Sequence, residues 1–321
     1  MRQLLINGEV FQARELIQGV HIYFLIALLS LASLLVILSI VKSKFTGQVL
    51  AANIFILLLG FLFLSWYHYK IFMGVELVDP LNRVVMGRLR APLWIENEKL
   101  YFWAIFLGLF SYAVYRRYKE GLFSRWLNIA FSAFIFLTML SSSPFSSPLP
   151  GLFKEILNYQ AAMGSGDVNI QVQNFQSFYG RVEYYYNSAY MWIHPPLLFI
   201  SYAALIVSFL ASVFMLIKRE ELYDRIAYSY AKLGYLILTL GMLVSYPWAL
   251  TAWANEPWWW SPKINMSIIM WMFYTAYLHS RLHLHRRGMW NATAVLGMLC
   301  FLTLVLTYIT TYVIPGVHSY G

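Results

Sequence analysis

Long apolar stretches separated by short basic connections constrain this chain more than any other feature. Eight stretches are long enough to cross a bilayer, which takes about 20 mostly apolar residues. Their approximate ranges are 21–41, 48–70, 99–115, 126–142, 190–217, 229–249, 264–284 and 291–314. Because an isolated strand cannot satisfy its backbone hydrogen bonds in lipid, each crossing is expected to be helical. We therefore predict an all-α fold, a polytopic helical bundle of about eight transmembrane helices in the lipid bilayer.

The composition agrees with a membrane protein. Of the 321 residues, 60% are hydrophobic and only 12% are charged, which is far from a soluble domain. The net charge of +9 comes from short basic clusters between apolar runs. A nucleic-acid-binding face would instead interleave basic residues on one surface, so no nucleic-acid partner is expected. The only cysteine, Cys300, lies in an apolar run, which excludes a disulfide framework and a C-x-x-C-H haem attachment motif.

The basic connections predict the orientation. Thirteen of the 23 Lys and Arg residues fall in four connections on one side of the predicted bundle: Lys42, Lys44, Arg116, Arg117, Lys119, Arg125, Lys218, Arg219, Arg225, Lys232, Arg281, Arg286 and Arg287. The positive-inside rule assigns this side to the cytoplasm. With eight crossings of a cell inner (plasma) membrane, both termini are then extracytoplasmic, as is the region around residue 255.

Two segments outside the crossings are expected to lie on the outer side. Residues 1–20 form an extracytoplasmic N-terminal segment, which lacks the pattern of a cleaved signal and could fold as a short interfacial helix. Residues 143–189 are long for a structureless loop, so a short interfacial helix or a partner contact is expected there. Residues 21–321 are predicted to form a single transmembrane domain.

The tryptophan-rich connection Trp248–Ser267 is the most distinctive segment on the outer side. It holds five tryptophans in thirteen positions: Trp248, Trp253, Trp258, Trp259 and Trp260. Pro257 and Pro262 prevent a continuous helix there. A few interfacial tryptophans are usual in membrane proteins, and an enlarged aromatic belt is one interpretation. Because anchoring needs fewer, we favour a flat aromatic shelf that holds a planar hydrophobic molecule.

Two histidines are predicted to lie beside this shelf. His194, in W-I-H-P-P-L-L-F, is at the outer mouth of the fifth crossing, where the double proline fits the first turn of a helix. His318, in P-G-V-H-S-Y-G, follows the eighth crossing. Each histidine taken alone is more often a structural residue. Their shared side and depth, next to the shelf, instead favour bis-histidine ligation of a non-covalently bound haem b.

His279 is expected at a different depth. It follows Ile264 by fifteen residues, or ~22 Å at 1.5 Å per residue, so it falls in the cytoplasmic half of the membrane. It could bind a second haem, whose other axial histidine would come from a membrane partner subunit, or be a hydrogen-bonded core histidine. No nucleophile–base–acid set appears at readable spacing, so no catalytic residue is assigned.

Several motifs in this order resemble the WWD-domain family of haem-handling membrane proteins in cytochrome c biogenesis. They are I-H-P-P-L-L, W-A-N-E-P-W, W-W-S-P-K, M-W-M-F-Y-T-A-Y-L-H and V-H-S-Y-G. W-A-N-E and H-S-Y-G resemble the CcsA/ResC type. T-M-L-S-S-S-P-F, P-L-W-I-E-N-E-K-L-Y-F-W and I-H-P-P-L-L-F-I-S-Y resemble the CcmF type. The likeness covers most of the chain from about residue 91 onward.

The resemblance implies a haem chaperone and lyase, a holocytochrome-c synthase component. In such proteins an outer haem lies on the tryptophan shelf between two histidines, here His194 and His318, and is presented to the C-x-x-C-H motif of an apocytochrome c. The resemblance also implies that His279 ligates a membrane-embedded haem, with its second ligand from another span or a partner subunit.

The chain departs from the family pattern at two shelf positions. Ser261 and Ile264 stand where the family has Asp and Glu, so hydrogen-bond acceptors and negative charge near the haem edge are lost. This affects lyase activity more than haem binding. The alternatives are a non-enzymatic haem-binding or structural subunit of a respiratory or assembly complex, and a transporter of haem.

Overall fold

The structure is a computed structural model that describes residues 7–119, 121–253 and 257–314. The chain forms two compact units, each described by itself below. Unit 1 comprises residues 1–108 and 128–192, and unit 2 comprises residues 109–127 and 193–321. This division by contacts does not test whether residues 21–321 form a single transmembrane domain, which stays a prediction.

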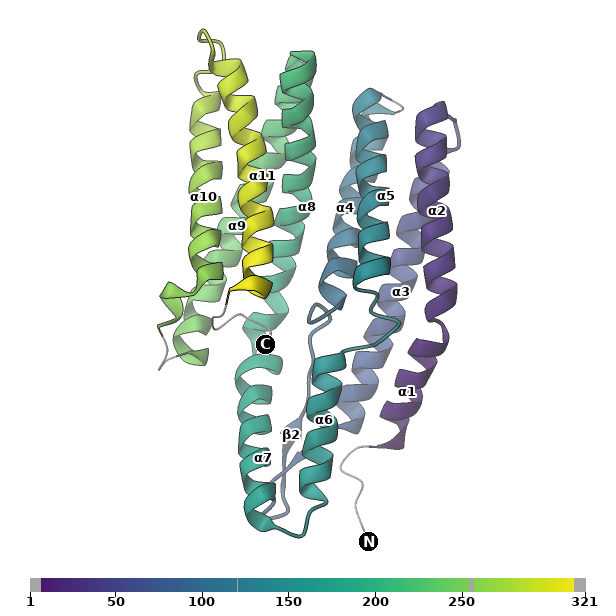
Figure 1. Ribbon diagram of the computed structural model, residues 1–321, viewed down its shortest axis with the longest axis vertical. Helices are drawn as coiled ribbons and strands as arrows, with labels where there is room; N and C mark the ends of the chain where they lie inside the picture. The colour runs from purple at the N-terminus through teal and green to yellow at the C-terminus, as the bar shows by residue number, and fades with distance from the viewer. Residues whose placement is uncertain (1–6, 120, 254–256, 315–321) are drawn as a thin grey trace. The chain divides into compact units, whose positions relative to one another are not determined.

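Helices make up most of both units (Figure 1). The α-helices are α1 Gly8–Gly19, α2 His21–Val41, α3 Thr46–Gly74, α4 Glu98–Tyr118, α5 Leu122–Ser141, α6 Pro150–Met163, α7 Val168–Arg181, α8 Ala189–Lys218, α9 Glu221–Ala252, α10 Pro262–Arg281 and α11 Met289–Val313. A π-helical turn, η1 (Val182–Tyr186), precedes α8, and a 3-10 turn, η2 (Trp258–Trp260), precedes α10. The all-α prediction is confirmed, apart from a small antiparallel hairpin of β1 (Glu76–Val78) and β2 (Val85–Arg88) that it missed.

Six helical stretches among the described residues are long and apolar enough to cross a membrane, as expected of a multi-pass membrane protein. They are Gly8–Val41, Thr46–Gly74, Leu122–Ser141, Ala189–Lys218, Glu221–Ala252 and Met289–Thr310. The other two predicted crossings are α4 and α10, which are helices of 21 and 20 residues. Each is ~30 Å long at 1.5 Å per residue, but both carry more polar and charged side chains. The count of eight crossings and the outer location of both termini stay predictions.

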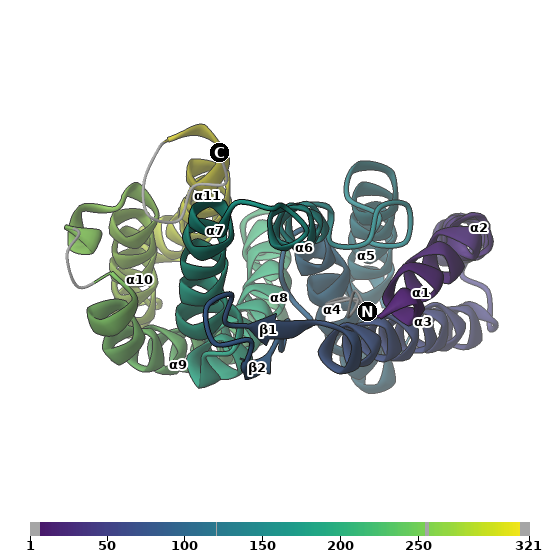
Figure 2. The ribbon, with the colours of Figure 1, turned by 90° about the horizontal axis from the view of Figure 1, so that it is seen from below.

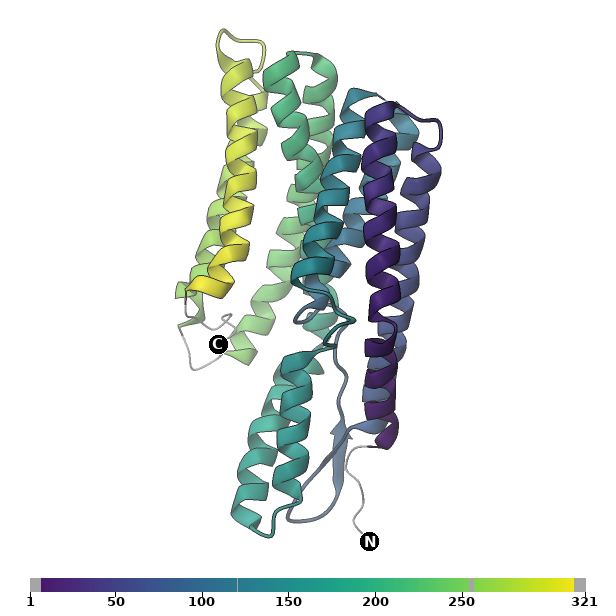
Figure 3. The same ribbon diagram turned by 45° about the vertical axis from the view of Figure 1, so that its right-hand side comes forward.

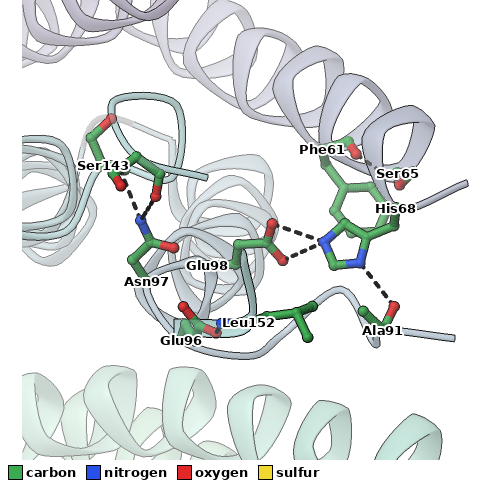
Figure 4. A network of polar contacts seen from close by, with 10 residues as sticks. Phe61, Ser65, His68, Ala91, Glu96, Asn97, Glu98, Ser143 and Leu152 are labelled. Carbon is green, nitrogen blue, oxygen red and sulfur yellow. Dashed lines mark hydrogen bonds and ion pairs between the residues drawn. The ribbon is translucent and has the colours of Figure 1, made fainter. Parts of the chain in front are cut away.

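A buried histidine–carboxylate pair joins α3 to the start of α4 in unit 1 (Figure 4). The His68 Nε2 atom lies 2.9 and 3.0 Å from the two carboxylate oxygens of Glu98. The Nδ1 atom donates to the carbonyl oxygen of Ala91 at 2.8 Å. His68 is 5% exposed and Glu98 is 1% exposed, so water cannot take over the hydrogen bonds if either partner is removed. The pair therefore fixes the loop that enters α4 against the end of α3.

A second carboxylate in the same loop caps α6. Glu96 accepts hydrogen bonds from the backbone N–H of Gly151 (2.8 Å) and of Leu152 (2.6 Å), the first residues of that helix after Pro150. A carboxylate is favourable at a helix N-terminus, where backbone N–H groups have no partner within the helix. Burial still raises the pKa of Glu96 above its usual value, because these two N–H groups offset the loss of water only in part.

The segment 143–189, expected to hold a short helix or a partner contact, contains the helices α6 and α7. They lie side by side next to the hairpin in unit 1 (Figure 3). The Tyr159 hydroxyl of α6 accepts a hydrogen bond from the backbone N–H of Val78 (2.9 Å). Asn187 donates to the Arg88 carbonyl (3.0 Å) and accepts from the Arg90 N–H (2.8 Å). These bonds attach the hairpin to the residues just before α8.

In unit 2, hydrogen bonds at seven-residue intervals hold α8 against α9. His194 Nδ1, Ser201 Oγ and Ser208 Oγ donate to the carbonyl oxygens of Gly241 (2.8 Å), Gly234 (2.7 Å) and Ala227 (2.9 Å), respectively. Donor numbers rise as acceptor numbers fall, so the two helices run antiparallel. A seven-residue repeat keeps one face of each helix against the other. We call these three bonds the α8–α9 ladder.

The acceptor positions of the α8–α9 ladder are small residues, which let the helix backbones come close. A Cβ added to Gly234 would lie 2.5 Å from the side chain of Leu205 and 3.2 Å from the carbonyl oxygen of Ser201. At Gly241 it would lie 3.0 Å from the side chain of Leu198. Small residues at such contacts are typical of helices packed within membranes.

Unit 2 also contains α10 and α11, together with residues 109–127 from the end of α4 and the start of α5. Figure 2 looks along the helices and shows α10 beside both α9 and α11, which agrees with their contacts. At the basic end of the unit, Arg281 of α10 makes a two-pronged ion pair with Asp224 of α9, at 3.0 and 2.7 Å. Its guanidinium also lies 3.9 Å from the ring centroid of Tyr228.

Replacing Glu98 by Ala is expected to destabilise the protein strongly, because it leaves the His68 imidazole buried without its partner. Breaking a buried pair costs about 3–5 kcal/mol. The measurement is thermal unfolding in detergent. The control is Glu76→Ala, which removes a pair with Arg88 that is 39–40% exposed and costs at most about 1 kcal/mol. Equal melting temperatures for the two variants would contradict a structural role for the buried pair.

Replacing Gly234 by Ala is expected to lower the melting temperature, because the new methyl group has no room between α8 and α9. Overpacking of this kind typically costs about 1–3 kcal/mol. Gly180→Ala in α7 is the matched control, since a Cβ there meets nothing within 4 Å. That control should be neutral or slightly stabilising, because alanine favours helix more than glycine does. If Gly234→Ala melts like the control, the close approach of the helices is not real.

Candidate functional site

His194 has the hydrogen bonding of a histidine prepared to bind a metal. Its Nδ1 lies 2.8 Å from the Gly241 carbonyl, which can only accept, so the proton is on Nδ1. Nε2 then keeps its lone pair. Metal-ligating histidines commonly donate their other ring N–H to a carbonyl in this way, which fixes the tautomer and the ring orientation. The α8–α9 ladder thus positions the first predicted haem ligand.

The double proline after His194 was predicted to lie in the first turn of a helix. It lies instead in the interior of α8. α8 begins at Ala189 and contains Pro195 and Pro196. Because Pro195 has no N–H, the Met191 carbonyl four residues earlier loses its helical partner. The indole Nε1 of Trp94 donates to that carbonyl instead. This bond satisfies the carbonyl that Pro195 leaves without a helical partner.

One tryptophan lies beside His194, and a second packs against the first. The ring centroid of Trp248, at the end of α9, lies 6.5 Å from that of His194, with the planes at 37°. Trp253 lies 4.8 Å from Trp248, with the planes at 58°. Trp248 is buried, at 5% exposure. The His194 imidazole therefore lies beside one indole, that of Trp248, which in turn packs against Trp253, at the end of unit 2 where α9 ends and α10 begins.

The remaining tryptophans line the turn between α9 and α10. Pro257 and Pro262 flank η2, so the predicted interruption of the helix is confirmed. Trp258 and Trp259 are edge-to-face, with centroids 5.8 Å apart and planes at 78°. Trp259 is 52% exposed and Trp260 is 72% exposed. The indoles of Trp248 and Trp253 are tilted and those of Trp258 and Trp259 are edge-on, so neither pair forms a flat shelf.

His279 is far from His194, and His318 is not among the described residues. His279 lies in the last turn of α10, seventeen residues after Pro262, or ~25 Å along the helix, so it cannot share an iron with His194. It is exposed, and its Nδ1 donates to the Thr275 carbonyl at 2.8 Å, which again leaves Nε2 open. His318 lies outside the described residues, which end at Ile314 just after α11.

His68 is excluded as a metal ligand because neither of its ring nitrogens is free to bind a metal. Both of its ring nitrogens are occupied, one by Ala91 and one by Glu98. Nothing in the sequence indicated this pair, because the partners are 30 residues apart and the β1–β2 hairpin and irregular segments lie between them. In the part of the chain that the structure describes, no group of three His, Cys, Asp or Glu residues could hold a metal ion.

The spacing of the α8–α9 ladder was a signal that the sequence did contain. Residues 194, 201 and 208 are His, Ser and Ser, and residues 227, 234 and 241 are Ala, Gly and Gly. One predicted helix carries polar residues at intervals of seven, and its neighbour carries small residues at the same intervals. Such a pattern indicates a hydrogen-bonded contact between the two helices. That pattern would have paired His194 with the Gly241 backbone.

Comparison with known proteins gives relatives that are named for cytochrome c biogenesis. A stretch of 104 residues is 38% identical to the "Cytochrome c biogenesis protein CcsA" of Prochlorococcus marinus (strain MIT 9215), and covers 32% of this chain and 32% of the relative. The protein of the same name from Synechococcus sp. (strain WH7803) is 36% identical over 105 residues, with the same coverage of both chains. The matched segment thus spans about a third of these curated relatives.

The fold and the family model extend the likeness. The solved structure "Cytochrome c Heme Lyase CcmF" is similar with a TM-score of 0.52 at 17% identity, over 92% of this chain and 46% of that one. At that identity the likeness concerns the fold alone. The model of the family described as "Cytochrome C assembly protein" matches residues 93–318, more than half of the chain and including every predicted site residue. This chain therefore belongs to the cytochrome C assembly protein family.

Proposed function

We propose that this protein takes part in cytochrome c maturation by binding haem b non-covalently at the tryptophan-bearing end of unit 2. The observation that carries the proposal is His194, whose Nδ1 is tied to Gly241 while Nε2 stays open beside Trp248. A haem needs an axial nitrogen and an apolar aromatic surface, and both occur here in a member of a cytochrome c assembly family. The residues present therefore fit the cofactor.

His318 is the proposed second axial ligand of this haem, and the tryptophans Trp253, Trp258, Trp259 and Trp260 are its proposed aromatic contacts. The basic clusters at the opposite end of unit 2, around Arg281, support an extracytoplasmic location for the site in a cell inner membrane. We further propose that residues 21–321 act as one haem-handling domain, with residues 1–20 as a segment on the outer side.

The proposed acceptor is an apocytochrome c with a C-x-x-C-H motif. Bound haem would supply two vinyl groups, across each of which a cysteine S–H adds, with sulfur on one carbon and hydrogen on the other. The protein's own contribution would be to hold the ring by His194 and His318 and to leave one side open. The exposure of Trp259 (52%) and Trp260 (72%) is consistent with an accessible side.

His279 is proposed to ligate a second, membrane-embedded haem. Its open Nε2 is on an exposed side chain at the other end of α10. Since His68 has no free nitrogen, it is not the opposite ligand. The second axial histidine is proposed to come from a membrane partner subunit.

The alternative function is a haem-binding or structural subunit that does not attach haem. Ser261 is its specific support, since this residue of the turn provides a hydroxyl and no negative charge, and Ile264 provides no polar group.

Replacing His194 by Ala is expected to shift and weaken the Soret band of the purified protein, because the outer haem loses an axial ligand. His318→Ala should have the same effect, and added imidazole should restore part of the band in each variant. His285→Ala, at the basic end of unit 2, is the control and should leave the spectrum unaltered. If neither His194→Ala nor His318→Ala changes the spectrum, the ligand assignment is wrong.

Co-expression with an apocytochrome c is expected to yield covalently bound haem that survives denaturing electrophoresis, detected by its peroxidase activity. The expected reason is that haem held between His194 and His318 is presented to both thiols together. The His194→Ala variant should reduce the yield severalfold. A wild-type protein that carries haem but leaves the apocytochrome unmodified would support the non-enzymatic alternative instead.

A further inference from the structure

Three connections between helices lie together at the basic end of unit 2, opposite the tryptophans. Trp290, at the start of α11, donates through Nε1 to the Met215 carbonyl near the end of α8 (2.9 Å), so the α10–α11 turn lies against the α8–α9 turn. The start of α5 joins them, since the ring centroid of Phe123 lies 5.8 Å from that of Phe214 in α8. The charges of all three connections therefore belong to one surface.

Cations outnumber acids at this basic end by more than two to one. The ten Lys and Arg residues are Arg116, Arg117, Lys119, Arg125, Lys218, Arg219, Arg225, Arg281, Arg286 and Arg287. The four acids of the same segments are Glu120, Glu220, Glu221 and Asp224. An excess of one sign repels itself and destabilises a compact state. An anion that binds at the basic end would therefore stabilise the fold.

Each of the three connections also exposes a large apolar side chain next to a cation. These side chains are Trp126 (50% exposed), Ile217 (68%) and Leu282 (74%), and each is adjacent in sequence to one of the ten Lys and Arg residues. The helices α5, α8, α9 and α11 are long and apolar enough to cross a membrane, so their ends at these connections fall at a membrane surface. A cation beside an apolar side chain suits that place, where one meets phosphate and the other meets acyl chains.

The α10–α11 turn holds two of these cations on a fixed backbone. Leu284 is 5% exposed and anchors the turn in unit 2. The Arg286 N–H donates to the His283 carbonyl (2.9 Å), and the Met289 N–H donates to the Arg286 carbonyl (3.1 Å). The side chains of Arg286 and Arg287 are exposed. Guanidinium groups bind phosphate through parallel hydrogen bonds, and a backbone that is already ordered loses little entropy when they do so.

We propose that the basic end of unit 2 binds anionic phospholipids, with the headgroup phosphate held by Arg286 and Arg287 and an acyl chain against Leu282. This inference goes beyond the proposed function and does not depend on haem. A zwitterionic headgroup brings its own cation, which the excess positive charge repels, so anionic lipid is preferred. Bound lipid would offset the repulsion among the three connections and stabilise the packing of the helix ends.

The test compares phosphatidylglycerol with phosphatidylcholine of the same acyl chains. Each lipid is titrated into the full chain in detergent, and bound lipid is counted by native mass spectrometry. The wild-type protein is expected to prefer phosphatidylglycerol, and added salt should reduce that preference. The double variant Arg286→Gln/Arg287→Gln is expected to lower it about 25-fold, since each cation near an anionic lipid surface contributes a factor of about five.

Two further variants sharpen the comparison. Leu282→Ser keeps every charge and removes the apolar contact, so it should weaken binding of both lipids and leave the preference unchanged. Arg90→Gln/Lys154→Gln removes two exposed cations of unit 1 and is the matched control, which should also leave the preference unchanged. Because the preference is a ratio of two affinities, a general loss of folded protein cancels. Inorganic phosphate is added as a competitor in a parallel titration.

The outcomes that contradict the proposal are distinct. If the wild type binds both lipids equally, or Arg286→Gln/Arg287→Gln keeps the full preference, the basic end is only a solvated surface. If the control loses as much preference, the attraction is general to exposed cations. If inorganic phosphate at the concentration of the lipid displaces phosphatidylglycerol, the site takes a free anion and not a lipid. Unchanged lipid binding by Leu282→Ser would contradict the acyl contact.

Discussion

The α8–α9 ladder is the contact on which the rest of the candidate site depends. In a membrane the apolar surfaces of two helices gain little from leaving lipid for each other, so close packing and hydrogen bonds must hold them together. Glycines at 234 and 241 allow the approach, and the side chains of 194, 201 and 208 use it to reach backbone carbonyls. The outermost bond of this series orients His194. The same contact therefore stabilises the helix pair and selects the tautomer that a metal ligand needs.

The hydrogen bonding of the two ring nitrogens distinguishes structural from candidate functional histidines better than their position in the sequence does. His68, His194 and His279 all donate to, or lie against, a backbone carbonyl through Nδ1. Only at His68 is the second nitrogen also occupied, by Glu98. From the sequence alone, His68 and His194 are both expected near the outer ends of their helices, so their positions do not distinguish them. Hydrogen bonding instead assigns it to the packing of the loop that enters α4.

Much of this fold could be predicted from the sequence because the bilayer restricts what an apolar run can become. All eight predicted crossings are helices in the structure, and the two prolines of the tryptophan-rich connection precede η2 and begin α10. Features that depend on partners distant in the chain could not be predicted. The His68–Glu98 pair, the Trp94 bond to Met191 and the β1–β2 hairpin each join segments through irregular loops. The tilt of the indoles depends on the conformation of η2, which no spacing of tryptophans reveals.

The described charges of unit 2 are concentrated at one of its two ends. Most of its basic residues, and all of its described acids, are at the end where α8 meets α9 and α10 meets α11. There cations can pair, as Arg281 does with Asp224. At the opposite end the described residues include five tryptophans and His194 but no acid. That asymmetry keeps most of the basic residues, which the positive-inside rule assigns to the cytoplasmic side, away from the aromatic end, as the proposed extracytoplasmic haem site requires.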